Sequence, residues 1–237
     1  MSLRANTNAA PIRPGRKTGP KPKFSADDVI DAALQLGLDT FTMAQVAQAV
    51  GVGAPSLYRL FSSRDDLVGA CLDRIASQIR WNPQHKDWLN LLRSWARMCW
   101  DLCETYPGFD ITLYTYPFPQ VHFMDYAERV FADFRATGQD NDTITFMMDF
   151  IGDTVITIHL GLGAYQDRHG HSPNQQLLQH NLERSREQID LDVSAFTRPD
   201  NAYERMVQPK VEFLLAALDA GVTPSPTWLK DDPSASH

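Results

Sequence analysis

The sequence predicts an all-α fold in which a small helical domain is followed by a larger one. Apolar residues recur at steps of three and four along most of the 237 residues, as they do in amphipathic helices. No convincing alternation of apolar and polar residues indicates a strand, and we find no internal repeat. Because 43% of the residues are hydrophobic, the chain can bury a substantial core. Four short helical segments come first and longer ones follow, with a boundary near residues 80–86.

Composition restricts the compartment. Three cysteines are too few for a disulfide framework, which favours the reducing cytoplasm. The first residues contain no apolar run of the kind a secretory signal needs. The most apolar later segment, 144–165, is interrupted by Asp149, Asp153 and His159, whose burial in lipid would be costly. We therefore expect neither export nor a membrane span.

The charge is distributed unevenly. The net charge is −7, yet residues 1–24 hold six basic residues and no acidic one, which leaves −13 for the remainder. Residues 1–24 are also rich in proline and glycine, so we expect a disordered basic arm. Such asymmetry suggests a polyanion-binding end on an acidic body.

The first two helices have recognisable starts. Ser25 is an N-cap followed by Asp27 and Asp28 in the first turn, and the helix should run to about Leu38. Thr42 with Gln45 three residues later forms the capping-box pattern of a second helix of about two turns. Gly51 then stands where a helix C-terminus favours a left-handed residue.

A third short helix is expected over 53–61 and a fourth from Ser62 or Ser63. The second and third helices, joined by a short glycine-containing turn at about 42–61, have the pattern of a helix-turn-helix. On the helical wheel Ala54, Leu57 and Phe61 share the inward side, and Pro55 and Arg59 lie opposite. This short-chained outer face suits a recognition helix that enters the major groove of DNA.

The stretch "DDVIDAALQLGLDTFTMAQVAQAVGVGAPSLYRLFSSRDDLV" resembles the DNA-binding domain of the TetR family of transcriptional regulators, and the resemblance covers about residues 25–75. It implies a homodimer that binds a palindromic operator in double-stranded DNA and a larger helical domain that binds a small-molecule inducer. The domains expected are an arm (1–24), a helix-turn-helix DNA-binding domain (25–80), an effector-binding and dimerisation domain (81–222) and a flexible tail (223–237).

Matching this sequence to the family pattern implies which residues contact DNA. Arg59 is expected at a base edge, Thr42, Ser56 and Tyr58 at the backbone, and Arg64 at a phosphate. Gly53 and Leu60 depart from the usual polar residues, and Leu60 should be partly packed. The full set of expected DNA-binding residues is Arg16, Lys17, Lys21, Lys23, Thr42, Ala54, Pro55, Ser56, Tyr58, Arg59 and Arg64. For the arm, a solvated tail is the alternative.

The body should consist of long helices. An apolar stripe begins at Trp88 and reaches Leu102, and a proline-containing stretch, 105–120, should then break the helix. Further helices are expected at about 120–137, 142–168, 174–188 and 199–220. The last of these, with the helix that contains Gly152, Gly161 and Gly163, is the expected four-helix bundle of the dimer; packing within one subunit is the alternative.

Aromatic and methionine side chains are abundant in the body, and most of them should form core. A subset is expected to line a cavity for a hydrophobic or aromatic effector: Trp88, Trp95, Met98, Phe109, Phe123, Met147 and His159. A hydrogen-bonded core histidine is the alternative for His159, and solvent exposure is the alternative for Asp149 and Asp153.

No catalytic grouping, cofactor motif or metal-ligand set emerges from the sequence. Cys99 and Cys103 share a helix face without a second ligand pair, so they should be core thiols. We therefore expect a ligand-responsive repressor and no enzyme, cofactor or metal. An activator of the same fold, or a helical small-molecule-binding protein or enzyme, remains the alternative.

Overall fold

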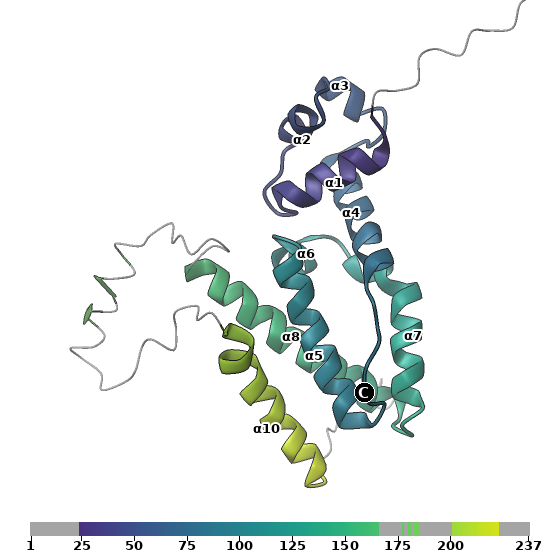
Figure 1. The fold of residues 1–237 in the computed structure, drawn as a ribbon, viewed down its shortest axis with the longest axis vertical. Helices are drawn as coiled ribbons and strands as arrows, with labels where there is room; N and C mark the ends of the chain where they lie inside the picture. The colour runs from purple at the N-terminus through teal and green to yellow at the C-terminus, as the bar shows by residue number, and fades with distance from the viewer. Residues whose placement is uncertain (1–23, 166–176, 178–179, 182, 185–200, 223–237) are drawn as a thin grey trace, which may run out of the picture.

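The computed structural model describes residues 24–165, 177, 180–181, 183–184 and 201–222. Its N-terminal helices form a compact group at one end of the molecule (Figure 1): α1 (Ala26–Leu36), α2 (Met43–Val50), α3 (Ala54–Leu57) and α4 (Arg64–Gln78). We call this group, residues 24–78, the N-terminal unit. The first helix is two residues shorter than expected. The third is regular over four residues, and a turn continues it to Phe61, whose N–H bonds to the Leu57 carbonyl at 2.9 Å.

The remaining described helices form the body: α5 (Trp88–Thr105), α6 (Phe109–Thr115), the 3-10 helix η1 (Pro119–Phe123), α7 (Met124–Arg135), α8 (Asn141–Tyr165), the π-helical turn η3 (Tyr203–Val207) and α10 (Gln208–Asp219). The long helices α5 and α8 pack against each other, α7 lies beside them, and α10 lies along the outside (Figure 1). The described residues contain no strand.

The expected break after α5 is present, since this helix ends at Thr105, but the short helix α6 inside 105–120 was not expected. Gly108 adopts a left-handed conformation at φ 76° and lets the chain turn directly from α5 into α6. The helix expected at 174–188 falls mostly outside the described residues, although those described within it are helical. The arm and the tail also lie outside them.

Local capping explains where the first helices begin. The capping boxes expected at Ser25 and Thr42 are both present: the Ser25 N–H bonds to Asp28 Oδ2 at 2.7 Å, and the Thr42 N–H bonds to Gln45 Oε1 at 2.8 Å. Ser63 caps α4 by accepting from the Asp66 N–H at 3.0 Å. Each cap contributes about 1 kcal/mol to the stability of short helices that are marginal alone.

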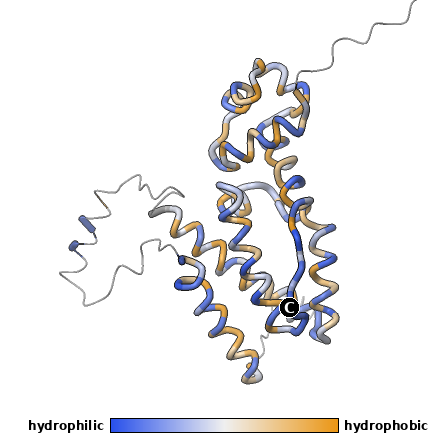
Figure 2. The backbone as a smooth tube through the Cα atoms, in the orientation of Figure 1, coloured by the Kyte–Doolittle hydropathy of each residue, from blue (hydrophilic) through white to orange (hydrophobic). Residues whose placement is uncertain are grey.

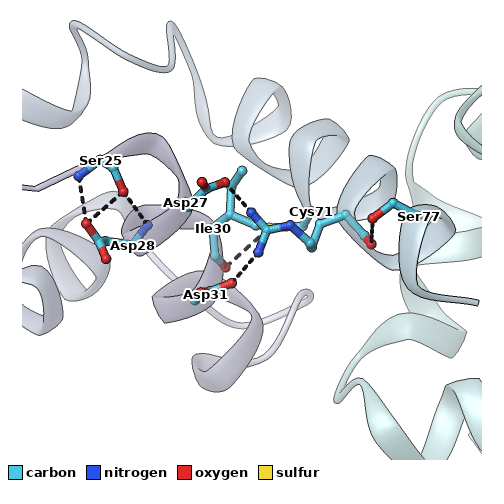
Figure 3. A network of polar contacts seen from close by, with 8 residues as sticks. Ser25, Asp27, Asp28, Ile30, Asp31, Cys71 and Ser77 are labelled. Atoms are coloured by element: carbon cyan, nitrogen blue, oxygen red, sulfur yellow. Dashed lines mark hydrogen bonds and ion pairs between the residues drawn. The ribbon is translucent and has the colours of Figure 1, made fainter.

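The N-terminal unit is held together by an apolar core and one ion-pair network. Apolar and polar residues alternate around its helices (Figure 2), and Val29, Leu57 and Leu67 are fully buried. Arg74 on α4 pairs with both Asp27 and Asp31 of α1, and the Cys71 thiol lies 3.9 Å from the Ile30 carbonyl (Figure 3). These contacts fix α1 across α4.

Among the described residues, one helix is long and apolar enough to cross a membrane by length and composition, the stretch Asn141–Gly163 of α8. In the fold it packs against α5, α6 and α7, and it buries Ile144, Met147, Ile151 and Val155. Core packing therefore accounts for part of its apolar composition.

Candidate DNA interface and ligand cavity

The turn between α2 and α3 has the predicted geometry. Gly51 ends α2 in the left-handed conformation (φ 74°, ψ 34°), and the Val52 N–H closes the turn on the Ala47 carbonyl at 2.9 Å. Gly53 is the N-cap of α3 and provides no side-chain cap, and a proline occupies the first turn. The two helices thus form a helix-turn-helix whose second helix begins with exposed backbone and small side chains.

The two faces of α3 are separated as the helical wheel predicts. Leu57 is 0% exposed and Phe61 is buried, whereas Pro55 and Arg59 point to solvent and Tyr58 is 53% exposed. Ala54 and Ser56 are half-buried. Leu60 keeps 44% of its surface exposed, so its packing is slight. The outward residues Pro55, Tyr58 and Arg59 can therefore reach a ligand that meets this end of the molecule.

Thr42 lies exposed at the N-terminus of α2, but its hydroxyl already has partners. It accepts from the Gln45 N–H at 3.2 Å and donates to Gln45 Oε1 at 2.9 Å. A phosphate oxygen that bonds to this hydroxyl would have to displace the Gln45 amide.

Arg64 has a role in the fold that sequence reasoning missed. Its Nη2 donates to the carbonyls of Leu38 and Asp39 at 2.7 and 3.0 Å, and its Nε donates to the Phe41 carbonyl at 3.0 Å. The guanidinium carbon also lies 4.7 Å from the Phe41 ring centroid. Arg64 therefore uses the N–H groups that were expected to contact phosphate to hold the loop between α1 and α2, residues 37–42.

The N-terminal unit carries little positive charge of its own. Residues 24–78 contain seven aspartates and three arginines, a net −4. Arg74 is paired with α1 and Arg64 with loop carbonyls, whereas Arg59 forms no ion pair with a described residue and faces outward. The expected arm contacts, Arg16, Lys17, Lys21 and Lys23, lie outside the described residues.

The body contains a cavity of about 430 Å³ between α5, α6, η1, α7 and α8. Four of the seven predicted pocket residues line it: Trp95, Met98, Phe109 and Phe123. Sequence reasoning missed other lining residues, among them Leu113, Tyr114, Tyr126, Met148, Gly152 and the two aspartates Asp149 and Asp153. The aspartates could have been found from their positions four apart on α8, because such spacing places both on one helix face.

The other three predicted pocket residues do not line this cavity. Trp88 packs edge-on against Phe134, with ring centroids 5.6 Å apart, and Met147 is fully buried on another side of α8. His159 is also buried and is fixed by carboxylates: Nδ1 lies 2.8 Å from Asp110 Oδ2, and Nε2 lies 3.1 Å from Glu104 Oε1. These placements correct the prediction, since apolar spacing does not reveal which neighbour a buried helix face meets.

The histidine joins three helices through charge. Burial by itself lowers the His159 pKa, but the hydrogen bonds and charges of Asp110 and Glu104 outweigh it, so the pKa is raised above 6.5. Burial raises the Asp110 pKa, but bonds from His159 and the Ile111 N–H outweigh it, so the carboxyl pKa is lowered. A protonated His159 therefore ties α8 to α5 and α6 beside the cavity.

The first joint between the body and the N-terminal unit is at Gly108. A Cβ on this residue would lie 2.0 Å from Asp39 Oδ1 and 2.7 Å from the Asp39 backbone nitrogen. Next to it, the Leu38 N–H donates to the Pro107 carbonyl at 2.8 Å. The loop that Arg64 holds from one side therefore rests on the start of α6 from the other.

The second joint is at Gly69, on the buried side of α4. A Cβ there would lie 2.8 Å from the Tyr116 hydroxyl and 3.2 Å from His122 Cε1. His122 Nδ1 also lies 2.7 Å from Asp73 Oδ1. The segment just before α7 thus packs closely on α4.

Both joints are next to cavity residues. Phe109 follows Gly108, and Phe123 follows His122; the two rings meet edge-on with centroids 6.1 Å apart. A ligand that changed the position of either ring would act one residue away from a contact with the N-terminal unit.

The cysteines are free and buried, as expected of core thiols, and burial raises the pKa of Cys99 to about 12. Within the part of the chain that the structure describes, no three His, Cys, Asp or Glu side chains lie together in a group that could hold a metal ion.

Comparisons with known proteins agree with this geometry. Residues 29–71 match the family described as bacterial regulatory proteins, tetR family. The HTH-type transcriptional repressor DrrR1 of Streptomyces coeruleorubidus is 40% identical over 67 residues, which are 27% of this chain and 24% of that protein. The chain therefore matches about a quarter of the length of this relative.

Solved structures share the fold over a longer range. A possible TetR family regulator from Streptomyces coelicolor aligns with a TM-score of 0.65 at 18% identity over 84% of this chain and 100% of its own. The S. coelicolor TetR family protein ActR, in complex with actinorhodin, aligns with a TM-score of 0.62 at 17% identity over 84% of this chain and 98% of its own. The family match therefore assigns the helix-turn-helix segment, residues 29–71, to the tetR family of bacterial regulatory proteins, and the solved structures show that the fold is shared over most of the chain.

Proposed function

We propose that the protein is a cytoplasmic, homodimeric repressor that binds a palindromic operator and is released from it by a small hydrophobic or aromatic effector. The observation that carries this proposal is the position of the cavity, whose wall residues Phe109 and Phe123 are next to both joints with the N-terminal unit. The named function of DrrR1 as a repressor, and the complex of ActR with actinorhodin, support it by analogy.

In this proposal α3 enters the major groove. Arg59 reads a base edge, and Pro55 and Tyr58 contact the adjacent backbone or bases from the same exposed face. Ala54 and Ser56 are half-buried and let the backbone approach closely. Because residues 25–80 are net negative, the basic arm supplies most of the attraction to phosphate, through Arg16, Lys17, Lys21 and Lys23 among others.

The release mechanism follows from the two joints. An effector that separates Phe109 from Phe123 displaces the start of α6, on which the Leu38–Asp39 backbone rests, and the end of η1, which packs on α4. The N-terminal units of the dimer then lose the spacing of the two half-sites. The shift in population is limited by the difference in effector affinity between the two conformations.

The dimer surface is proposed on α8 and α10. Phe213 is 80% exposed and Phe150 is 47% exposed, and both line one shallow apolar groove between these helices. Part of the helix expected in the dimer bundle packs within the subunit, since Val207, Val211 and Leu215 are buried there. Gly152 lines the cavity instead, whereas Gly161 has open space around it and Gly163 likewise. A partner subunit would cover the exposed phenylalanines.

The test is footprinting of the purified protein on the DNA that flanks its own gene, with the Arg59→Ala variant alongside. Loss of a bidentate arginine contact should cost about 1–3 kcal/mol, roughly a tenfold to hundredfold loss of operator affinity or selectivity. Arg80→Ala is the matched control, since it removes an exposed arginine that follows α4, outside the helix-turn-helix. A footprint that Arg59→Ala leaves unchanged contradicts the base contact, and the lack of any specific footprint contradicts the proposed function.

A further inference from the structure

We infer that the effector is a cation with a flat aromatic or lipophilic framework, such as an aromatic amine, held by Asp149 and Asp153 at one wall of the 430 Å³ cavity. This inference rests on the proposed function and specifies the chemical class of its ligand. It depends on the arrangement of aromatic walls and charges around this partly open cavity.

The walls suit a flat apolar framework. Rings from four elements face the cavity, those of Trp95, Phe109, Phe123 and Phe131, and the thioethers of Met98 and Met148 fill the gaps between them. Aromatic faces attract cations as well as apolar groups, and thioethers adapt to rings of different shape. The volume falls within the range of about 300–1,000 Å³ typical of small-molecule sites.

The charges of the wall have a single sign. Asp149 and Asp153 are its charged residues, and no lysine, arginine or histidine is among the residues that line it. Arg129 lies over the ring of the lining residue Tyr126, with its guanidinium carbon 5.9 Å from the centroid, but it does not itself line the cavity. The cavity therefore repels an anionic ligand and attracts a cationic one.

Asp149 and Asp153 are both exposed to solvent, so their carboxylates lie at the open side of the cavity and have few partners within the described protein. The Tyr114 hydroxyl donates to Asp153 Oδ1 at 3.3 Å, but neither aspartate forms an ion pair within the described residues. Lys210 of α10 lines a neighbouring groove with both aspartates and is not ion-paired to either. Burial, and then the charge of Asp153, raise the pKa of Asp149, so a bound cation would relieve the repulsion within the pair.

Gly152 has no side chain that could cover Asp149 and Asp153 from the side of the cavity. It lies between the two aspartates on α8 and is itself part of the wall, and a Cβ there would come to 3.7 Å from Trp95 Nε1. The Trp95 N–H is satisfied by the Met148 carbonyl at 2.8 Å, which fixes the indole plane against α8. A flat ligand can therefore lie against the indole with its cationic group between the carboxylates.

The experiment compares two tricyclic probes of similar shape and opposite charge on the full-length protein, 9-aminoacridine as the cation and 9-anthracenecarboxylate as the anion. Fluorescence titration of the protein in the absence of DNA measures affinity, because a cationic acridine also intercalates into duplex DNA. The cation should bind at least about tenfold more tightly than the anion.

Asp149→Asn with Asp153→Asn should weaken cation binding about tenfold or more and reduce the difference between the probes. Asp142→Asn is the control, because it removes an exposed charge from the same helix away from the cavity and should leave cation affinity unchanged. Equal or tighter binding of the anion overturns the inference, as does an unchanged cation affinity in the double variant or no binding of the cation. In each of these cases the operator footprint still decides the proposed function separately.

Discussion

The contact of Gly108 with Asp39 allows a quantitative test of the joint between the body and the helix-turn-helix. An alanine at Gly108 would have its Cβ 2.0 Å from Asp39 Oδ1, 2.6 Å from Asp39 Cγ and 2.7 Å from the Asp39 backbone nitrogen. Real Cβ contacts are not this short, so the loop or α6 must move. Since the nitrogen belongs to the backbone, rotation of the Asp39 side chain alone cannot relieve the overlap.

Two costs add in Gly108→Ala. A non-glycine residue in the left-handed region, here at φ 76°, costs about 1–2 kcal/mol. Overpacking against a fixed neighbour costs about 1–3 kcal/mol more. The expected loss in the free energy of unfolding is thus roughly 2–5 kcal/mol, and each kcal/mol should lower the melting temperature by about 2–4 °C in a chain of this size.

Gly138→Ala separates the two costs. Gly138 is also left-handed, at φ 85°, but a Cβ there would have nothing within 4 Å. It should therefore lose about 1–2 kcal/mol, the backbone cost alone. The measurement is urea unfolding followed by circular dichroism, with operator affinity measured in parallel. Asp39→Ala in the Gly108→Ala background removes two of the three overlapping atoms and should recover part of the stability.

The reasoning is refuted if Gly108→Ala is no less stable than Gly138→Ala, or if Asp39→Ala restores nothing. Operator affinity should also fall in Gly108→Ala, because the displaced loop carries the N-cap of α2, Thr42, and is held to α4 by Arg64. Normal operator affinity in a clearly destabilised Gly108→Ala variant would show that the loop position does not control the helix-turn-helix.

Two further predictions concern charge. Deletion of residues 1–23 removes six cations from a protein whose N-terminal unit is net negative, so the affinity for DNA should fall for all sequences. The slope of log affinity against log salt concentration should decrease in magnitude by up to about 5. An unaltered slope would argue against contacts between the arm and phosphate. Because the pKa of His159 is raised in the folded state, the folded protein binds this proton more tightly than the unfolded chain does, and protonation stabilises the fold. This contribution to the free energy of unfolding is complete below the ordinary pKa of 6.5 and is lost as pH rises through the pKa of the folded state. Urea unfolding between about pH 6 and pH 9 should show this decline, and His159→Gln should flatten it; an equally steep decline in the variant would assign it to other groups.

Local signals in the sequence were sufficient for the N-terminal unit. The caps at Ser25, Thr42 and Ser63, the left-handed Gly51 and the division of α3 into a buried and an exposed face all depend on residues within one or two turns of one another. Hydrogen bonds of this range are determined by residue type and spacing, so reading the sequence recovers them.

The cavity and the joints required the tertiary structure. Periodicity shows that Trp88, Met147 and His159 lie on apolar helix faces, but it does not show what each face meets. Trp88 packs against Phe134, Met147 is buried in the core without lining the cavity, and His159 contacts Asp110 and Glu104. Asp149 and Asp153 are exposed, which was the alternative weighed for them, but the sequence does not reveal that they line the same cavity as several aromatic side chains.

Arg64 shows the same division between local and long-range information. Its position at the start of α4 is a local property and was predicted, whereas its bonds to carbonyls 23 to 26 residues earlier depend on how the α1–α2 loop returns to α4. The sequence by itself therefore determined the helices of the N-terminal unit and the division of α3 into a buried and an exposed face. Only the tertiary structure decided which side chains surround a ligand and which contacts transmit its binding, because those pairs come from elements far apart in the chain.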